Sequence, residues 1–139
     1  MHKIGELSLQ AFKNNFLYSP ITIEDFDRQY AYYLSSIDPR YVLIAERNED
    51  LLGYIFAIPN YIDRSKKGLI IKTLARSSDA DSKGLGTVLS GALIDLAKSD
   101  GYEYIINAYY HDLNVSSNIS RKYKGVIFKN YELLSLNLI

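Results

Sequence analysis

Thr73–Leu89 reads TLARSSDADSKGLGTVL: along it an apolar strand ends, a polar loop follows and a helix begins at a pair of glycines. Just before the loop, residues 69–75 (LIIKTLA) are almost continuously apolar, which is typical of a strand in the middle of a sheet. After the glycines, apolar residues recur at helical spacing from Val88 to Ala97. The stretch therefore predicts a central strand, a loop and a helix with one buried face.

The flanking segments predict a mixed sheet with covering helices. Tyr41–Glu46 and Leu51–Ile58 are strand-like runs separated by a short polar turn, which predicts an antiparallel hairpin. Gly53, inside the second run, favours a bulge or close backbone packing. Helices are expected over 6–17, from a Thr22/Asp25 capping box onward and over Asn114–Tyr123, and strands over Tyr104–Ala108, Val126–Phe128 and Tyr131–Leu136. The predicted fold class is a mixed α/β (α+β) sheet.

Composition narrows the classes of function. The 139 residues suit one domain, expected over 1–139, with a helical N-terminal part (1–38) and a core (40–136). Lys plus Arg and Asp plus Glu both number 16, a balance that does not favour nucleic acid. The chain has no cysteine and two histidines, so disulfides, a thiolate nucleophile and a metal site are not expected. Without a secretory signal or membrane-length apolar run, we expect a cytoplasmic protein that does not bind membranes.

The glycine pair at the helix start favours an anion site. First-turn amides have no helical acceptor, and the helix dipole adds partial positive charge there. Gly84 and Gly86 would let a phosphate approach the backbone, and Thr87 adds a hydroxyl. Glycine pairs also open helices that bind nothing. No Lys-Ser/Thr follows as in a P-loop, and Leu89 stands where a dinucleotide fingerprint has its third glycine.

With its surroundings, this stretch resembles the GNAT superfamily of acyl-CoA-dependent N-acyltransferases. DSKGLG (81–86) is similar to the family's Arg/Gln-x-x-Gly-x-Gly/Ala, although Asp81 replaces the first residue. NVSS (114–117) is similar to its Asn-x-x-Ser/Ala, and KYKGVIF (122–128) to its Tyr-x-x-x-Gly-Phe close. The resemblance spans residues 40–136. The first strand usual in the family is missing, and Arg76 and Ser78 replace a common apolar residue and proline.

The resemblance implies that coenzyme A, as acetyl-CoA or another acyl-CoA, is the co-substrate. The backbone of Leu74, Ala75 and Arg76 would pair with the pantetheine arm. The pyrophosphate would be held by the backbone amides of Ser82, Lys83, Gly84, Leu85, Gly86 and Thr87. The side chains of Asn114 and Ser117 would reach the pantetheine or the phosphates, and Lys83 and Arg121 would supply positive charge to the phosphates. The Asp81 carboxylate would repel the phosphates unless it points away.

Three side chains are candidate catalytic groups. Tyr123 is the candidate acid for the leaving thiolate, although Arg121 occupies the family's usual tyrosine position. Glu46 and His111 are candidate bases, and Asp112 would orient the histidine. Each also has a simpler interpretation: Tyr123 as core packing, Glu46 as a solvated turn residue and His111 as a surface residue.

These observations favour an N-acyltransferase that moves an acetyl or other acyl group directly to a small-molecule or peptide amine. The absence of cysteine argues against an acyl-cysteine enzyme intermediate. The alternative is a catalytically inactive GNAT-fold module that binds acyl-CoA or serves assembly, as a domain of a longer protein. A nucleotide-binding regulatory domain is disfavoured by the early hairpin. An open end of the sheet would suit a homodimer.

Overall fold

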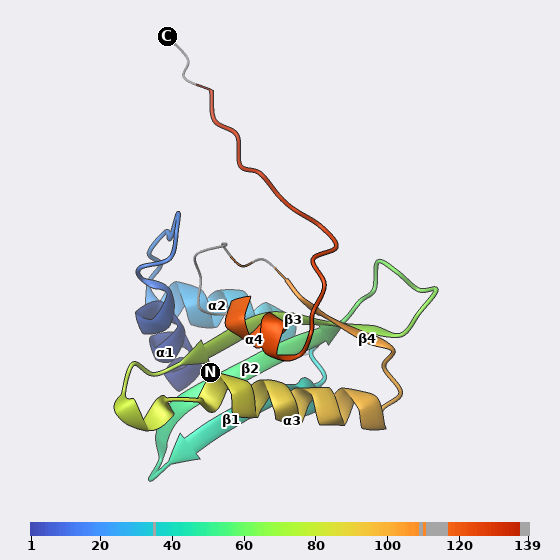
Figure 1. Ribbon diagram of the computed structural model, residues 1–139. Coiled ribbons are helices and arrows are strands. Elements are labelled where there is room, and N and C mark those ends of the chain that lie inside the picture. The colour runs from blue at the N-terminus through green and yellow to red at the C-terminus, as the bar shows by residue number, and fades with distance from the viewer. Residues whose placement is uncertain (35, 109, 111–116, 137–139) are drawn as a thin grey trace.

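The computed structural model describes residues 1–34, 36–108, 110 and 117–136, which form a four-stranded sheet with helices on both faces (Figure 1). The strands lie in the order β1-β2-β3-β4; the first two pairs are antiparallel and β3 and β4 are parallel. This confirms the predicted mixed α/β class. In chain order the elements are α1 (His2–Phe12), α2 (Ile23–Leu34), β1 (Val42–Arg47), β2 (Asp50–Pro59), β3 (Gly68–Arg76), α3 (Leu85–Ser99), β4 (Tyr104–Asn107) and α4 (Ser117–Lys122), with short 3-10 turns at Pro39–Tyr41 and Ala80–Ser82.

Two apolar clusters hold the helices on the sheet. Helix α3 contacts β1, β2 and β3, and its Leu89 and Leu93 pack on Ile55 and Leu69 in the main core. Helix α1 covers β2 and β3 through a smaller cluster of Leu7, Tyr54 and Ala75. The central strands are thus buried on both faces, which explains the near-continuous apolar character of β3.

Gly53 brings α3 close to the sheet. A Cβ at this position would lie 2.8 Å from Leu85 Cδ2 and 2.9 Å from the Ala75 carbonyl oxygen, and both distances are too short for real atoms. The prediction of close packing at Gly53 is therefore confirmed. This close packing places the first turn of α3 beside the end of β3.

The two N-terminal helices agree with the sequence in different degrees. The Asp25 amide donates to Thr22 Oγ1 at 3.1 Å, so the predicted cap of α2 is confirmed. Helix α1 begins at His2 and ends at Phe12, earlier than the predicted 6–17. The polar run after Phe12 turns the chain instead, and Leu17 adopts a positive φ of 55°, which a helix does not allow.

The prediction of a final strand pair over Val126–Phe128 and Tyr131–Leu136 was wrong for this structure. After α4 the chain runs away from the sheet, and residues 124–136 belong to no strand (Figure 1). The alternating apolar pattern was strand-like, but a strand forms only where a neighbour supplies hydrogen bonds, and none lies beside it in the described chain. Among the described helices, none combines the length and apolar character needed to cross a bilayer.

Candidate coenzyme A site and acceptor cavity

The site begins with a bulge in β3. Phe56 pairs with Thr73 and Ala57 with Ile71, so Lys72 is an extra residue without a partner on β2. Pairing between β3 and β4 ends at the same point, with Ile71 opposite Asn107. A bulge bends its strand, and bulges are frequent beside active sites. From Lys72 to Arg76, β3 therefore has no described strand on its β4 side.

Backbone groups of two residues point into this gap. The Ser77 amide donates to the Leu52 carbonyl at 2.8 Å, on the β2 side of the strand. Backbone groups alternate in direction along an antiparallel strand, so those of Leu74 and Arg76 point to the opposite side. By the same alternation, the groups of Ala75 belong to the ladder with β2. Of the three residues expected to pair with pantetheine, two thus face the gap.

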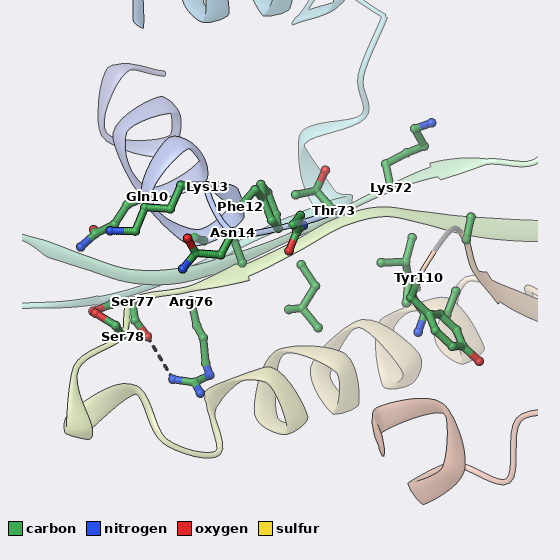
Figure 2. A pocket seen from close by; sticks show the side chains of 17 residues that line it. Gln10, Phe12, Lys13, Asn14, Lys72, Thr73, Arg76, Ser77, Ser78 and Tyr110 are labelled. Atoms are coloured by element: carbon green, nitrogen blue, oxygen red, sulfur yellow. Dashed lines mark hydrogen bonds between the residues drawn. The ribbon is translucent and has the colours of Figure 1, made fainter. Parts of the chain in front are cut away.

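A network of short hydrogen bonds fixes the loop after β3. Ser82 is fully buried, and its Oγ lies 2.5 Å from the Ser77 carbonyl and 2.8 Å from that of Asp79. The Arg76 guanidinium donates to the Ser77 carbonyl at 3.0 Å (Figure 2). It also donates to Ser82 Oγ at 3.0 Å. The loop therefore holds the start of α3 in a set position relative to the end of β3.

Three consecutive amides at the start of α3 have no acceptor among the described residues: those of Gly84, Leu85 and Gly86. Gly84 is the N-cap at φ 83°, in the left-handed region that favours glycine, and a Cβ added there would meet nothing within 4 Å. The other amides expected to hold pyrophosphate, at Ser82, Lys83 and Thr87, already donate to carbonyl groups of the chain. Of the amides predicted to form the anion site, three thus have no acceptor in the described chain, and the space beside the first of them, at Gly84, is open.

Asp81 is neutralised by a partner from the far edge of the sheet. Its Oδ2 accepts from the Arg47 guanidinium at 2.5 Å, and both side chains are exposed. This hydrogen bond, together with the charge of Arg47, holds the pKa of the Asp81 carboxyl below its usual value. The carboxylate is therefore compensated beside the three free amides.

A cavity of about 470 Å³ opens along the unpaired part of β3 (Figure 2). The strand itself, the end of α1 with the following turn, and the chain after β4 form its walls. Lys13, Lys72 and Arg76 are the charged side chains among its described lining residues, and all are cationic. The other lining residues are Gln10, Ala11, Phe12, Asn14, Asn15, Ile71, Thr73, Leu74, Ala75, Ser77, Ser78, Asn107, Ala108 and Tyr110.

The predicted catalytic residues do not meet in this cavity. The Tyr123 hydroxyl donates to the Thr87 carbonyl at 3.2 Å, against the first turns of α3. Glu46 is exposed on β1, at the opposite edge of the sheet from β4. Ser117, which was predicted to contact coenzyme A, is buried at the start of α4. His111 and Asn114 lie outside the described residues, so their predicted roles remain predictions.

Tyr110 and Thr73 line the cavity and were not singled out from the sequence. Thr73 lies beside the Tyr30 and Tyr54 hydroxyls, and the Tyr54 hydroxyl lies 2.7 Å from Ser8 Oγ. Burial raises the pKa of Tyr54 to about 12 and also raises that of Tyr30, so both phenols stay protonated at neutral pH. The only signal in the sequence was the high tyrosine content, which does not say which rings reach a cavity.

The family model for the acetyltransferase (GNAT) family matches residues 7–118, most of the chain. The chain belongs to the GNAT acetyltransferase family. The predicted resemblance is confirmed, and the match includes the bulged strand, the loop and α3. No curated protein matches the sequence.

Solved GNAT-type structures share this fold at low sequence identity. A Trypanosoma brucei acetyltransferase aligns with a TM-score of 0.60 at 13% identity, covering 98% of this chain and 95% of that one. An aminoglycoside acetyltransferase from an uncultured soil metagenomic sample, in complex with sisomicin, aligns with a TM-score of 0.64 at 15% identity, covering 99% of this chain and 87% of that one. Ribosomal-protein-alanine N-acetyltransferase from Brucella melitensis aligns with a TM-score of 0.63 at 19% identity, covering 86% of this chain and 75% of that one. At these identities the likeness establishes the fold and leaves the acceptor open.

Proposed function

We propose that this GNAT protein transfers an acetyl or other acyl group from acyl-CoA to an amine. One observation carries the proposal: the strand edge freed by the bulge at Lys72 leads directly to the free amides of Gly84, Leu85 and Gly86. An extended amide-containing arm suits the strand edge, and an attached phosphate suits the helix start. Coenzyme A combines these two features.

The residues present fit coenzyme A. The backbone of Leu74 and Arg76 would bind the pantetheine arm as an added strand, and the amides of Gly84–Gly86 would bind the pyrophosphate. The open space beside Gly84 is the place that a side chain would fill. Lys83 adds an exposed positive charge next to these amides.

Acyl-CoA supplies a thioester whose acyl carbon forms the new C–N bond as the C–S bond breaks. This chain must hold the two reactants in line, take a proton from the amine and return one to the thiolate. A free amide on the gap side of β3 suits the oxygen that gains negative charge. Tyr110 is the one tyrosine among the described residues that line the cavity, and we assign it the acid's role in preference to Tyr123. His111, the next residue in the chain, remains our predicted base.

The acceptor is proposed to be a neutral or anionic amine, as a small molecule or a peptide end. The charged groups among the described cavity-lining residues are Lys13, Lys72 and Arg76, which would repel a polycation and attract a carboxylate or phosphate on the acceptor. The catalytically inactive alternative is not favoured. The charge of Asp81, the displaced tyrosine and the missing first strand were its support, and Arg47 compensates the first of these.

The proposal is tested by calorimetric titration of the purified chain with coenzyme A and acetyl-CoA, followed by a screen of amine acceptors. Thiol release can be followed with a chromogenic disulfide, because the chain has no cysteine to give a background. We expect micromolar binding of both ligands and acceptor-dependent thiol release, faster with carboxylate-bearing amines than with polyamines. No binding at millimolar ligand would overturn the coenzyme A site. Binding without turnover on any amine would leave the non-catalytic module as the better description.

A further inference from the structure

A second, smaller cavity lies between the two N-terminal helices. Residues of α1, of the turn after it and of α2 enclose about 170 Å³. None of its described lining residues carries a charge, whereas the main cavity has three cations. We call this cavity the α1–α2 pocket. Its aliphatic and aromatic lining residues are Leu9, Phe12, Tyr18, Ile21, Phe26 and Tyr30.

The size and lining of the α1–α2 pocket suit one aromatic ring. An apolar cavity of about 150 Å³ is large enough to bind benzene. The pocket has about this volume, and four of its lining side chains are themselves aromatic. Two of them, Phe26 and Tyr30, are stacked with their ring centroids 4.4 Å apart. Aromatic rings pack well against other rings in stacked or edge-to-face contacts, so a further ring fits this lining.

The α1–α2 pocket adjoins the main cavity. Phe12 lines both of them. Tyr30, from the pocket, lies beside Thr73, from the main cavity. Lys13 directly follows Phe12 and is one of the cations of the main cavity. A ligand with a ring in the pocket therefore has its polar end in the main cavity, close to a positive charge.

The pocket is on the side of the sheet away from the proposed coenzyme A site. Figure 2 shows Lys13 and Thr73 on the α1 side of β3 and Arg76 on the α3 side. The alternation of side chains along a strand agrees, because positions three apart point to opposite faces. The free amides of residues 84–86, which we assign to coenzyme A, open α3. The α1 side is therefore left for the acceptor.

We propose that the acceptor is an amine with an aromatic ring and a carboxylate close to its nitrogen, as in an aromatic α-amino acid. The proposal rests on the acyl transfer proposed above. The ring fills the α1–α2 pocket, the carboxylate pairs with Lys13, and the nitrogen lies in the main cavity. There the nitrogen forms a bond to the acyl carbon as the C–S bond breaks. Of the two protons that the ammonium loses, one ends on the thiol of coenzyme A and the other goes to solvent.

Three matched amines test this acceptor class. L-Alanine lacks the ring of L-phenylalanine, and phenethylamine lacks its carboxylate. With saturating acetyl-CoA, we expect kcat/KM for phenylalanine to exceed that for alanine about 10- to 100-fold, because burial of the ring contributes to binding. It should exceed that for phenethylamine about threefold or more, because Lys13 pairs with the carboxylate.

The same assays separate failure of this inference from failure of the proposed function. Acyl transfer to amines with no preference for the ring would overturn the aromatic acceptor and leave the acyl transfer standing. No transfer to any amine, phenylalanine included, would overturn the proposed function and this inference with it.

A variant that fills the α1–α2 pocket tests where the ring binds. Ile21 lines the pocket and is 41% exposed, so a larger side chain can enter the pocket without displacing the core. We expect Ile21→Trp to raise KM for phenylalanine about tenfold or more relative to KM for acetyl-CoA. Ile44→Trp is the matched control, because Ile44 is 48% exposed on β1 and lines neither cavity. It should leave both constants unchanged, and equal effects of the two variants would overturn the proposal.

Acyl-CoA donors of increasing chain length test whether the acyl group occupies the pocket instead. With phenylalanine as acceptor, we expect Ile21→Trp to affect acetyl-CoA and hexanoyl-CoA reactions equally. A preference for the longer donor that Ile21→Trp removes would show that the pocket holds the acyl chain, and would overturn the proposal.

Discussion

Replacing Gly84 by alanine separates the binding role of the α3 start from its structural role. At φ 83° an L-residue costs about 1–2 kcal/mol, so we expect the free energy of unfolding to fall by about that amount. No steric clash adds to it, because an added Cβ meets nothing within 4 Å. Relief of the strain requires the peptide planes beside residue 84 to turn, which redirects the amides of Gly84 and Leu85.

The expected loss of coenzyme A binding follows from those amides. A hydrogen bond from an amide to a charged phosphate contributes about 1.5–3 kcal/mol, so loss of one raises the dissociation constant about 10- to 100-fold. Titration calorimetry with coenzyme A measures the change, and urea denaturation measures the stability.

The chain contains a matched control at the other end of the same helix. Gly101 follows the C-cap of α3, has φ 75° and likewise has nothing within 4 Å of an added Cβ. Gly101→Ala should lose similar stability and bind coenzyme A unchanged. If both variants lost affinity equally, the effect would reflect general destabilisation. If neither did, the α3 start would not be the phosphate site.

Three further outcomes are expected. The phenol of Tyr54 has a pKa of about 12 in the folded chain and near 10 in the unfolded chain, so the unfolded chain loses this proton at lower pH. The free energy of unfolding therefore keeps its full value below pH 10 and falls by up to about 3 kcal/mol as the pH rises to 12. Urea denaturation of Tyr54→Phe should show a shallower decline over that range, and an identical slope would contradict the reasoning. Arg47→Ala should weaken coenzyme A binding about threefold at low salt, because it leaves the negative charge of Asp81 unpaired. Adding Asp81→Ala should restore the affinity. If the affinity of the double variant stayed low, the idea that Arg47 compensates Asp81 would be contradicted. In steady-state assays, Tyr110→Phe should lower kcat at least tenfold and Tyr123→Phe by less, and the reverse order would return the acid's role to Tyr123.

The order of the central elements was predictable because each has a local cause. The apolar run in β3, the turn between β1 and β2, the Thr22 cap and Gly84 all act over a few residues, and each had the expected effect. Strand bounds agreed to within a residue for the same reason. The final strand pair failed because strand formation depends on a partner that local pattern does not identify.

The residues that line the cavity were less accessible to sequence reasoning because they depend on where strands separate. The bulge at Lys72 is a difference in register between β2 and β3, and nothing in LIIKTLA marks which residue is extra. Once the strands diverge there, Tyr110 reaches the cavity, whereas Tyr123 turns to the Thr87 carbonyl. Aligning a sequence motif residue by residue does not show which tyrosine side chain points into the cavity.

Asp81 shows why a departure from a family motif has to be judged in three dimensions. In the sequence it is a negative charge three residues before Gly84, and it argued against phosphate binding. In the fold, Arg47 at the end of β1 reaches it at 2.5 Å, because the β1–β2 hairpin brings that end of the sheet beside the loop. The partner is 34 positions away in sequence, beyond the reach of any local pattern. The substitution and its compensation together leave the amides of α3 open to an anion, so the altered motif is compatible with the family's chemistry.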